Sequence, residues 1–370
     1  MRMDSQAPLP IHEVLPGEIM AIIFEEHAKL KWRAPAIDGR VCRLWRQIVL
    51  NAPRAWTYLE FGSLRLRISG LLLWLDRSRT APLHITIGRF FTLKFDANNR
   101  RLYESLYTRI ASLRMFQNCY SFFDGRHFPC MQHLEVVGNH WSRFHSLSVW
   151  FGHMPKLRSL RLGRLPHVAS LDGLSPLKVL ALSNGTFTSL SQHSSSLISL
   201  TLHDVKLGDA ISGSMDFPSL TYLSLHRMSD LKPHINAPRL VTYHEFSANA
   251  HKSFSAPLHS LVEYGLLALH HYIPDLTEWH NSFPNISRLS IRAGPPSLKS
   301  ILESLSIHPH LLPSLQMISI AHSRDFTKEE QGAMEDLVRV RSEACHLDVA
   351  LYFETKQRFH IPLFFGGVSL

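Results

Sequence analysis

One six-residue pattern constrains the fold of this chain more than any other feature, because it recurs over most of the 370 residues. It consists of an apolar residue, two variable residues, an apolar residue, one variable residue and a further apolar residue. Clear copies are LRSLRL from 157, LKVLAL from 177, LISLTL from 197 and LTYLSL from 220. All copies begin 20 to 29 residues apart, at positions 110, 131, 157, 177, 197, 220, 240, 261, 286 and 315. A unit this short cannot cover its own apolar face, so we expect neighbouring units to stack into one continuous core.

The alternating apolar residues in each copy predict a short strand whose apolar side chains point into that core. In the four clear copies these residues are Leu160, Leu162, Leu180, Leu182, Leu200, Leu202, Leu223 and Leu225. The period is typical of leucine-rich repeats. Ordinary βαβ units are the alternative, but about 14 residues between strands are too few for long helical crossovers. We therefore predict an α/β chain in which residues 62–353 form an irregular leucine-rich-repeat solenoid, or horseshoe, with a parallel sheet on its inner side.

Other segments predict the elements that flank the repeats. Residues 69–79 have helical spacing and residues 82–87 alternate like a strand, and a second helix is expected within 97–110. Thr327 and Glu330 form a capping-box pattern that predicts a helix through Arg341, and residues 347–353 predict a last strand. The tail, residues 354–370, carries no motif from which a structure is predicted.

Residues 9–61 predict a small helical module ahead of the repeats. Pro16 suits a helix start, and the segment Ile19–Phe24 holds apolar residues on one side of a helical period. A second apolar stripe contains Val41, Leu44, Trp45, Ile48 and Val49, and Pro53 ends that helix. A module of this size buries little surface alone, so we expect it to lean on the repeats or on a partner.

The residues that point to a partner are Leu15-Pro16, Ile22-Ile23-Phe24, Val41 to Arg46, Pro53 and Trp56. In this order and spacing they resemble the F-box. With the repeats behind it, the chain resembles fungal, basidiomycete-type F-box proteins that carry a leucine-rich-repeat-like C-terminal region.

The resemblance implies that the module docks onto a Skp-type adaptor bound to a cullin scaffold. The chain would then be the substrate-recognition subunit of an SCF-type (cullin-RING) ubiquitin ligase. By match to the family motif, the adaptor-binding residues would be Leu15, Pro16, Ile19, Ile23, Cys42 and Trp45. The alternative is a leucine-rich-repeat scaffold or binding protein without a ligase role, whose helical start caps the solenoid. A cap should bury its apolar stripe, whereas a receptor should leave it partly exposed.

Charge and composition limit the partners. The net charge is +9, and residues 1–110 carry 17 Lys and Arg against 10 Asp and Glu. A basic front suits nucleic acid or an acidic protein, and we favour the protein because no basic run or aromatic stacking motif is present. Four dispersed cysteines predict no disulfide framework, and no apolar run has the length of a signal peptide or a membrane span. We expect an intracellular protein, in cytoplasm or nucleus, with no membrane contact.

The common hydrolase, metalloprotease, nucleotide and dinucleotide signatures are missing, so we expect no enzyme activity and no cofactor. Among the 24 histidines, His270-His271 is the one adjacent pair, and adjacent strand residues point to opposite sides, which makes a poor chelate. We therefore expect no metal site.

A target protein should dock on the strand residues that point away from the core. The middle repeats place ring-bearing residues there, with two arginines further on that favour an acidic segment of the target. The expected target-binding residues are His203, Tyr222, His226, His244, Phe246, Arg288 and Arg292. His203 and His226 hold equivalent positions, but we favour a protein-binding patch over a metal pair because no Cys or carboxylate is placed beside them. The histidines predict binding that changes between pH 5 and 8.

Overall fold

The computed structural model describes residues 15–61, 68–88, 100–116, 126–137, 153–163, 171, 173–187, 190–207, 214–228, 235–245, 254, 257–268, 275–293, 295–322, 326–342 and 347–353. Residues 9–14, Phe246, His270-His271 and the tail 354–370 therefore lie outside the described residues. The chain divides into two compact units, Met1–Leu177 and Lys178–Leu370. No helix among the described residues has the length and apolar character needed to cross a membrane.

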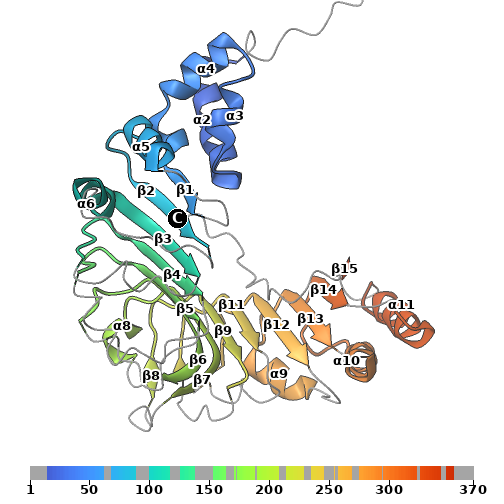
Figure 1. The fold of residues 1–370 in the computed structure, drawn as a ribbon. Coiled ribbons are helices and arrows are strands. Elements are labelled where there is room, and N and C mark those ends of the chain that lie inside the picture. Colours follow the sequence, from blue (N-terminus) through green and yellow to red (C-terminus); the bar gives the residue numbers. More distant parts are fainter. Residues whose placement is uncertain are drawn as a thin grey trace, which may run out of the picture. The chain divides into compact units, whose positions relative to one another are not determined.

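The first unit begins with the predicted helical module, shown in blue in Figure 1. It contains α2 (Gly17–Leu30), α3 (Ala34–Asp38), α4 (Arg43–Leu50) and the 3₁₀ helix η1 (Pro53–Trp56). Pro16 is the N-cap of α2, and helix α2 buries Met20, Phe24 and Ala28, which are spaced one turn apart. Phe24 is therefore buried, whereas its sequence neighbours Ile22 and Ile23 are exposed. The predicted single stripe is split between the core and the surface.

Three tryptophans pack the module against the next helix of the same unit. Trp74 of α5 (Ile68–Arg77) meets Trp32 and Trp56 edge-on, with ring centroids 5.5 and 5.0 Å apart. The Trp56 Nε1–H donates a hydrogen bond of 2.8 Å to the carbonyl of Val49. These contacts give the small module the neighbour that it needs to bury its core.

The other described elements of the first unit are β1 (Tyr58–Phe61), β2 (Leu83–Ile87), α6 (Arg100–Arg109), β3 (Ile110–Phe116), β4 (His133–Val137) and β5 (Ser159–Gly163). The five strands are parallel and follow one another in chain order. One row of register partners crosses them in the core, Leu59, Ile85, Leu113, Leu134 and Leu160. The predicted helices within 69–79 and 97–110 and the strand at 82–87 are confirmed.

The second unit holds eight further parallel strands. In spatial order they are β6 (Val179–Phe187), β7 (Ser199–Leu207), β9 (Tyr222–His226), β11 (Thr242–Glu245), β12 (Glu263–Ala268), β13 (Arg288–Ala293), β14 (Met317–His322) and β15 (Asp348–Phe353). The short β8 (Met215–Asp216) and β10 (Ile235–Asn236) pair separately. Every copy of the repeated pattern, including the weak ones from 240 onward, ends in a strand, so the predicted α/β class with a long parallel sheet is confirmed.

The eight inward leucines named above are all buried, at 2% exposure or less. Leu180, Leu200 and Leu223 are register partners on neighbouring strands, and the row continues through Tyr243 and Tyr264. The sheet therefore has one leucine-lined face, because side chains alternate across each strand.

A buried carboxylate interrupts the next inward row, which runs through Leu182, Leu202 and Leu225. Glu245 stands where the clear copies have their last leucine, and it is 1% exposed. The Tyr243 hydroxyl donates a hydrogen bond of 2.9 Å to Glu245 Oε2, and the Tyr264 hydroxyl donates to Oε1. Two phenol donors on neighbouring strands thus satisfy the acid inside the core.

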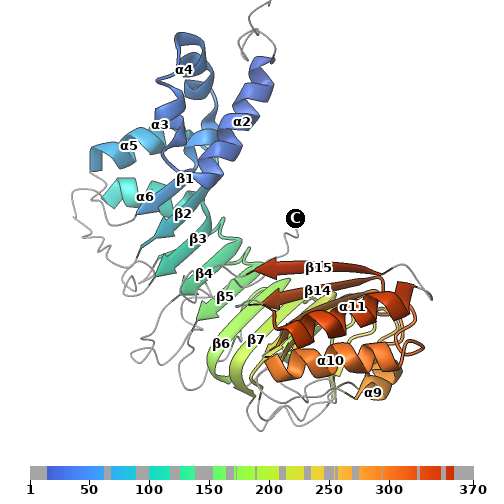
Figure 2. The same ribbon diagram turned by 90° about the vertical axis from the view of Figure 1, so that its right-hand side faces the viewer.

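Helices close the second unit: α8 (Ser191–Ser194), α9 (Leu276–Ser282), α10 (Pro295–Ile307) and α11 (Lys328–Ser342). Figure 2 shows α10 and α11 side by side at the β14–β15 end of this sheet. The predicted capping box is present, since the Glu330 amide donates to Thr327 Oγ1 (3.2 Å) and the Thr327 amide donates to Glu330 Oε2 (2.8 Å). Arg341, near the end of α11, is completely buried and donates to the carbonyls of Leu305, Leu311 and Leu312.

Candidate functional site

The helical module exposes an apolar patch that a folded monomer would ordinarily bury. Six large apolar side chains are 41% to 60% exposed, and they come from α2, α3, the residue before Cys42 and α4. They are Ile19, Ile22, Ile23, Ile37, Val41 and Leu44. These six residues are called the apolar patch below. The three helices pack on one another, and His27 Nδ1 lies 3.1 Å from Asp38 Oδ2, which ties α2 to α3. Exposed apolar surface of this kind marks protein interfaces.

The six residues predicted to bind an adaptor divide into two groups. Pro16, Ile19 and Ile23 are exposed, while Leu15, Cys42 and Trp45 are half-buried. The Trp45 ring packs on Phe24 of α2, with centroids 5.2 Å apart.

Cys42 is the N-cap of α4, and its sulfur accepts a hydrogen bond of 3.4 Å from the Trp45 amide. Cys42 and Trp45 therefore help to fix the position of α4, Cys42 by capping it and Trp45 by packing on α2. The sequence-based site omitted Ile22, Ile37, Val41 and Leu44. For Ile22, Val41 and Leu44 the signal was present as apolar spacing, but spacing alone does not distinguish a core stripe from an interface stripe.

The second candidate surface is the polar face of the sheet in the second unit. Tyr222 and His226 of β9, His203 of β7, and His244 of β11 all lie on it. The His203 and His226 ring centroids are 5.6 Å apart, and Tyr222 meets His244 edge-on at 5.6 Å. The strands thus bring four of the expected target-binding residues together, and Phe246 lies outside the described residues.

The two expected arginines lie further along the same face. Arg288 begins β13 and Arg292 follows on the same side of that strand. Glu263 lies between the histidine and arginine groups, with Oε1 3.5 Å from His244 Nε2 and Oε2 3.7 Å from Arg288 Nη1. The close approach of His244 lowers the pKa of Glu263, and the charge of Arg288 lowers it further. Arg288 therefore already forms an ion pair with a carboxylate of its own chain.

A glycine makes room for His244. Gly265 is its register partner on β12, and a Cβ added there would lie 2.7 Å from His244 Cδ2. The imidazole therefore lies across the neighbouring strand, where only glycine leaves space. The glycine in LVEYGL, inside a predicted strand, was the signal for this close approach.

Burial is the main cause of the pKa shifts of two histidines on this surface. It lowers the pKa of His226 to about 4, helped by the nearby His203, His244 and Arg227. Burial also lowers the pKa of His203, and Arg227 adds to that effect. His226 is therefore mostly neutral above pH 5 and would contribute little to a change of binding between pH 5 and 8. Among the described residues, no group of three or more His, Cys, Asp and Glu side chains could hold a metal ion.

Replacing His226 by glutamine should flatten the pH dependence of stability on the acid side. Because the folded pKa of about 4 lies below the ordinary value of 6.5, the unfolded chain takes up a proton first as the pH falls. The wild type should lose about 2 kcal/mol from this group between pH 7 and pH 4.5. Urea unfolding at both pH values measures the difference, and the exposed His259→Gln serves as control. An equal pH slope in all three proteins would contradict the assignment.

The chain matches no model of a protein family, and no curated protein matches it.

Proposed function

We propose that this chain is the substrate-recognition subunit of an SCF-type cullin-RING ubiquitin ligase. The N-terminal module binds a Skp-type adaptor, and the polar sheet face of the second unit binds the target protein. The chain itself carries no catalysis and needs no cofactor, and it works inside the cell, in cytoplasm or nucleus. The observation that carries the proposal is the apolar patch, because it coincides with the segment that resembles an F-box.

The exposure of the patch favours a receptor over a capping module. A module that only closed the repeats would bury its apolar side chains against the first strands. Instead, Trp56 and Trp74 make the contact within the unit, while Ile19 and Ile23 stay 42% exposed. Two separate apolar surfaces on α2, one facing inward and one facing solvent, support a docking role.

The arrangement of the strands supports a leucine-rich-repeat-like solenoid behind the module. Within each unit the strands are parallel, follow chain order and keep the leucine row in register. In the described part of the connection from β6 to β7, the helix is the four-residue α8, shorter than the helix of a βαβ unit. Residues 62–353 are therefore proposed to be repeats, with the variable strand residues available to a target.

Binding to the adaptor tests the proposal directly. The purified full-length chain and a Skp-type adaptor should elute together in size-exclusion chromatography at micromolar concentration. Tagged protein recovered from its own cells should also bring adaptor and cullin with it. Separate elution of the purified proteins would rule the ligase role out and leave the scaffold alternative.

Replacing Tyr222 by alanine should weaken target capture about 10-fold or more and leave adaptor recovery unchanged, because interface tyrosines are frequent anchors. The Tyr222 ring contacts the His244 ring edge-on in the polar face. Tyr222→Phe keeps the ring and is the matched control. Quantitative proximity labelling in cells with the ligase blocked compares the three proteins, with the adaptor as internal standard. If every partner of the wild type is recovered equally with Tyr222→Ala, the target site lies elsewhere.

A further inference from the structure

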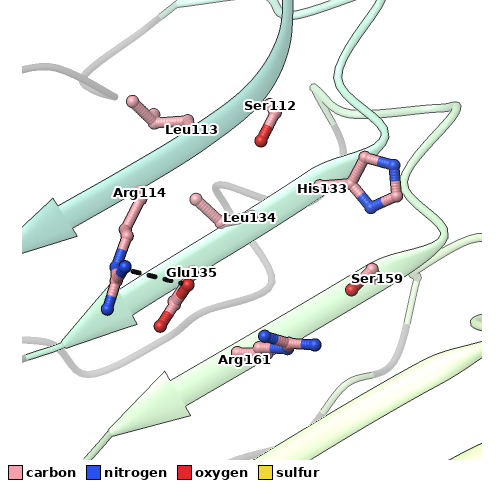
Figure 3. A pocket seen from close by; sticks show the side chains of 8 residues that line it. All are labelled: Ser112, Leu113, Arg114, His133, Leu134, Glu135, Ser159 and Arg161. Carbon is pink, nitrogen blue, oxygen red and sulfur yellow. Dashed lines mark ion pairs between the residues drawn. The ribbon is translucent and has the colours of Figure 1, made fainter. Parts of the chain in front are cut away.

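A polar hollow of about 230 Å³ opens on the sheet of the first unit, across β3, β4 and β5 (Figure 3). Two rows of register partners line it. Ser112, His133 and Ser159 form one row. Arg114, Glu135 and Arg161 form the other. The hollow therefore contains two arginines and one carboxylate, and its fixed charge is +1.

The charges are unevenly distributed within the hollow. Arg114 Nε lies 3.4 Å from Glu135 Oε2, and this pair occupies one end. In Figure 3 the Arg161 side chain, on which Glu135 also acts, runs toward the end that holds Ser159 and His133. That end presents a guanidinium, two hydroxyls and an imidazole, all of which can donate hydrogen bonds to an oxyanion.

The electrostatics of His133 indicate a positive potential at this end. Partial burial lowers the pKa of His133, and Arg161 and Arg158 lower it further. The other ring facing it, His84 on β2, also has a pKa lowered by burial, and His133 and Lys29 add to that shift. The two charged groups that lower the pKa of His133 are both arginines, and an anion bound here would offset their repulsion.

A second hollow of about 230 Å³ adjoins the first and shares Ser112, Arg114 and Glu135 with it. Its walls include Leu30, Trp32 and Tyr58. The Leu30 residue is 88% exposed, and the Tyr58 ring stacks on His84 with centroids 4.8 Å apart. Lys29 and Glu60 complete the polar part of its rim. The two hollows together offer an oxyanion site next to an apolar one, all within the first unit.

We infer that these hollows bind an acidic peptide segment of a partner protein, with a side-chain carboxylate held by Arg161 and Ser159 and an apolar neighbour against Leu30, Trp32 and Tyr58. A carboxylate matches the charge of +1. A phosphate dianion would be repelled by Glu135 more strongly than a carboxylate, so we expect the carboxylate peptide to bind more tightly than its phosphorylated counterpart. The site lies in the other unit from the sheet-face residues discussed above, and its occupancy does not require the adaptor.

The test uses the full-length chain with ¹³C-labelled histidine and three peptides, Ac-Leu-Gly-Glu-Gly-Leu-NH₂ and its glutamine and phosphoserine counterparts. The His133 NMR signal, assigned by its loss in His133→Gln, should shift saturably with the glutamate peptide, and the pKa of His133 should rise. The glutamine peptide should cause no saturable shift. Arg161→Met should weaken binding about 10- to 100-fold, as expected for the loss of charge-assisted hydrogen bonds.

Two further variants keep the inference falsifiable. Arg288→Met removes an arginine of the second unit and should leave peptide binding unchanged. Glu135→Gln raises the charge of the hollow to +2, so it should tighten binding of both the glutamate and the phosphoserine peptide. Equal binding by wild type and Arg161→Met, or no shift of His133, would overturn the site. Tighter binding of phosphoserine than glutamate by the wild type would overturn the carboxylate assignment.

Discussion

Replacing Ile23 by aspartate should abolish the complex with a Skp-type adaptor at micromolar concentration. Ile23 belongs to the apolar patch and is 42% exposed, so the substitution places a charge in the proposed interface while most of the fold is untouched. Truncation of an interface anchor costs about 2 kcal/mol or more, and an unpaired buried carboxylate adds to this. We expect Kd to rise at least about 100-fold, measured by titration calorimetry.

The same substitution at Leu30 is the control. Leu30 lies on the same helix, is also apolar and is 88% exposed, but it is not part of the apolar patch. Leu30→Asp should therefore bind the adaptor like the wild type. Circular dichroism of both variants checks that α2 remains folded. Equal loss of binding in the two variants would mean that the patch is not the specific interface.

Replacing Arg341 by methionine should destabilise the end of the second unit by about 3–5 kcal/mol. Its guanidinium is fully buried and donates to the carbonyls of Leu305 (3.4 Å), Leu312 (3.2 Å) and Leu311 (2.8 Å). Methionine fills similar space but donates nothing, so these carbonyls lose their charged donor. Hydrogen exchange of the α10 and α11 amides should speed up strongly, because it reports the free energy of local opening.

Arg339→Met on the same helix provides the comparison. Arg339 is two-thirds exposed, and its contact with Asp336 at 2.8 Å is a surface ion pair. Such pairs contribute about 0–1 kcal/mol, so exchange in α10 and α11 should barely change. Similar exchange rates in the two variants would show that the buried arginine does not hold α11 in place.

The repeated pattern predicted the strands well because a leucine at every second position has one stable outcome in a sheet. Leu200 and Leu202 illustrate this, since both are buried in register with their neighbours. The capping box at Thr327 was equally readable, because its partners lie three residues apart. Features that depend on residues close together in the sequence were therefore predicted correctly.

The remaining features depend on residues far apart in the sequence. Helix α2 has apolar residues around most of its circumference, so spacing did not reveal that Met20 faces inward and Ile22 outward. The buried Arg341 finds its carbonyl partners about thirty residues upstream, and the sequence gives no sign of that contact. His226 appeared to be an ordinary titrating residue, but burial and three neighbouring groups shift its pKa. Such effects arise only when the strands are assembled.

The carboxylate of Glu245 has a consequence for how this chain can change during evolution. Tandem arrays ordinarily grow and shrink by duplication or loss of single units, since each unit meets its neighbours through interchangeable leucines. Glu245 is instead satisfied by one tyrosine from its own strand and one, Tyr264, from the next. Deleting β12 alone, or inserting a leucine unit between β11 and β12, would remove the Tyr264 hydroxyl from the buried Glu245 carboxylate. We therefore expect these two units to be inherited together, and variation in array length to fall in the segments on either side of them.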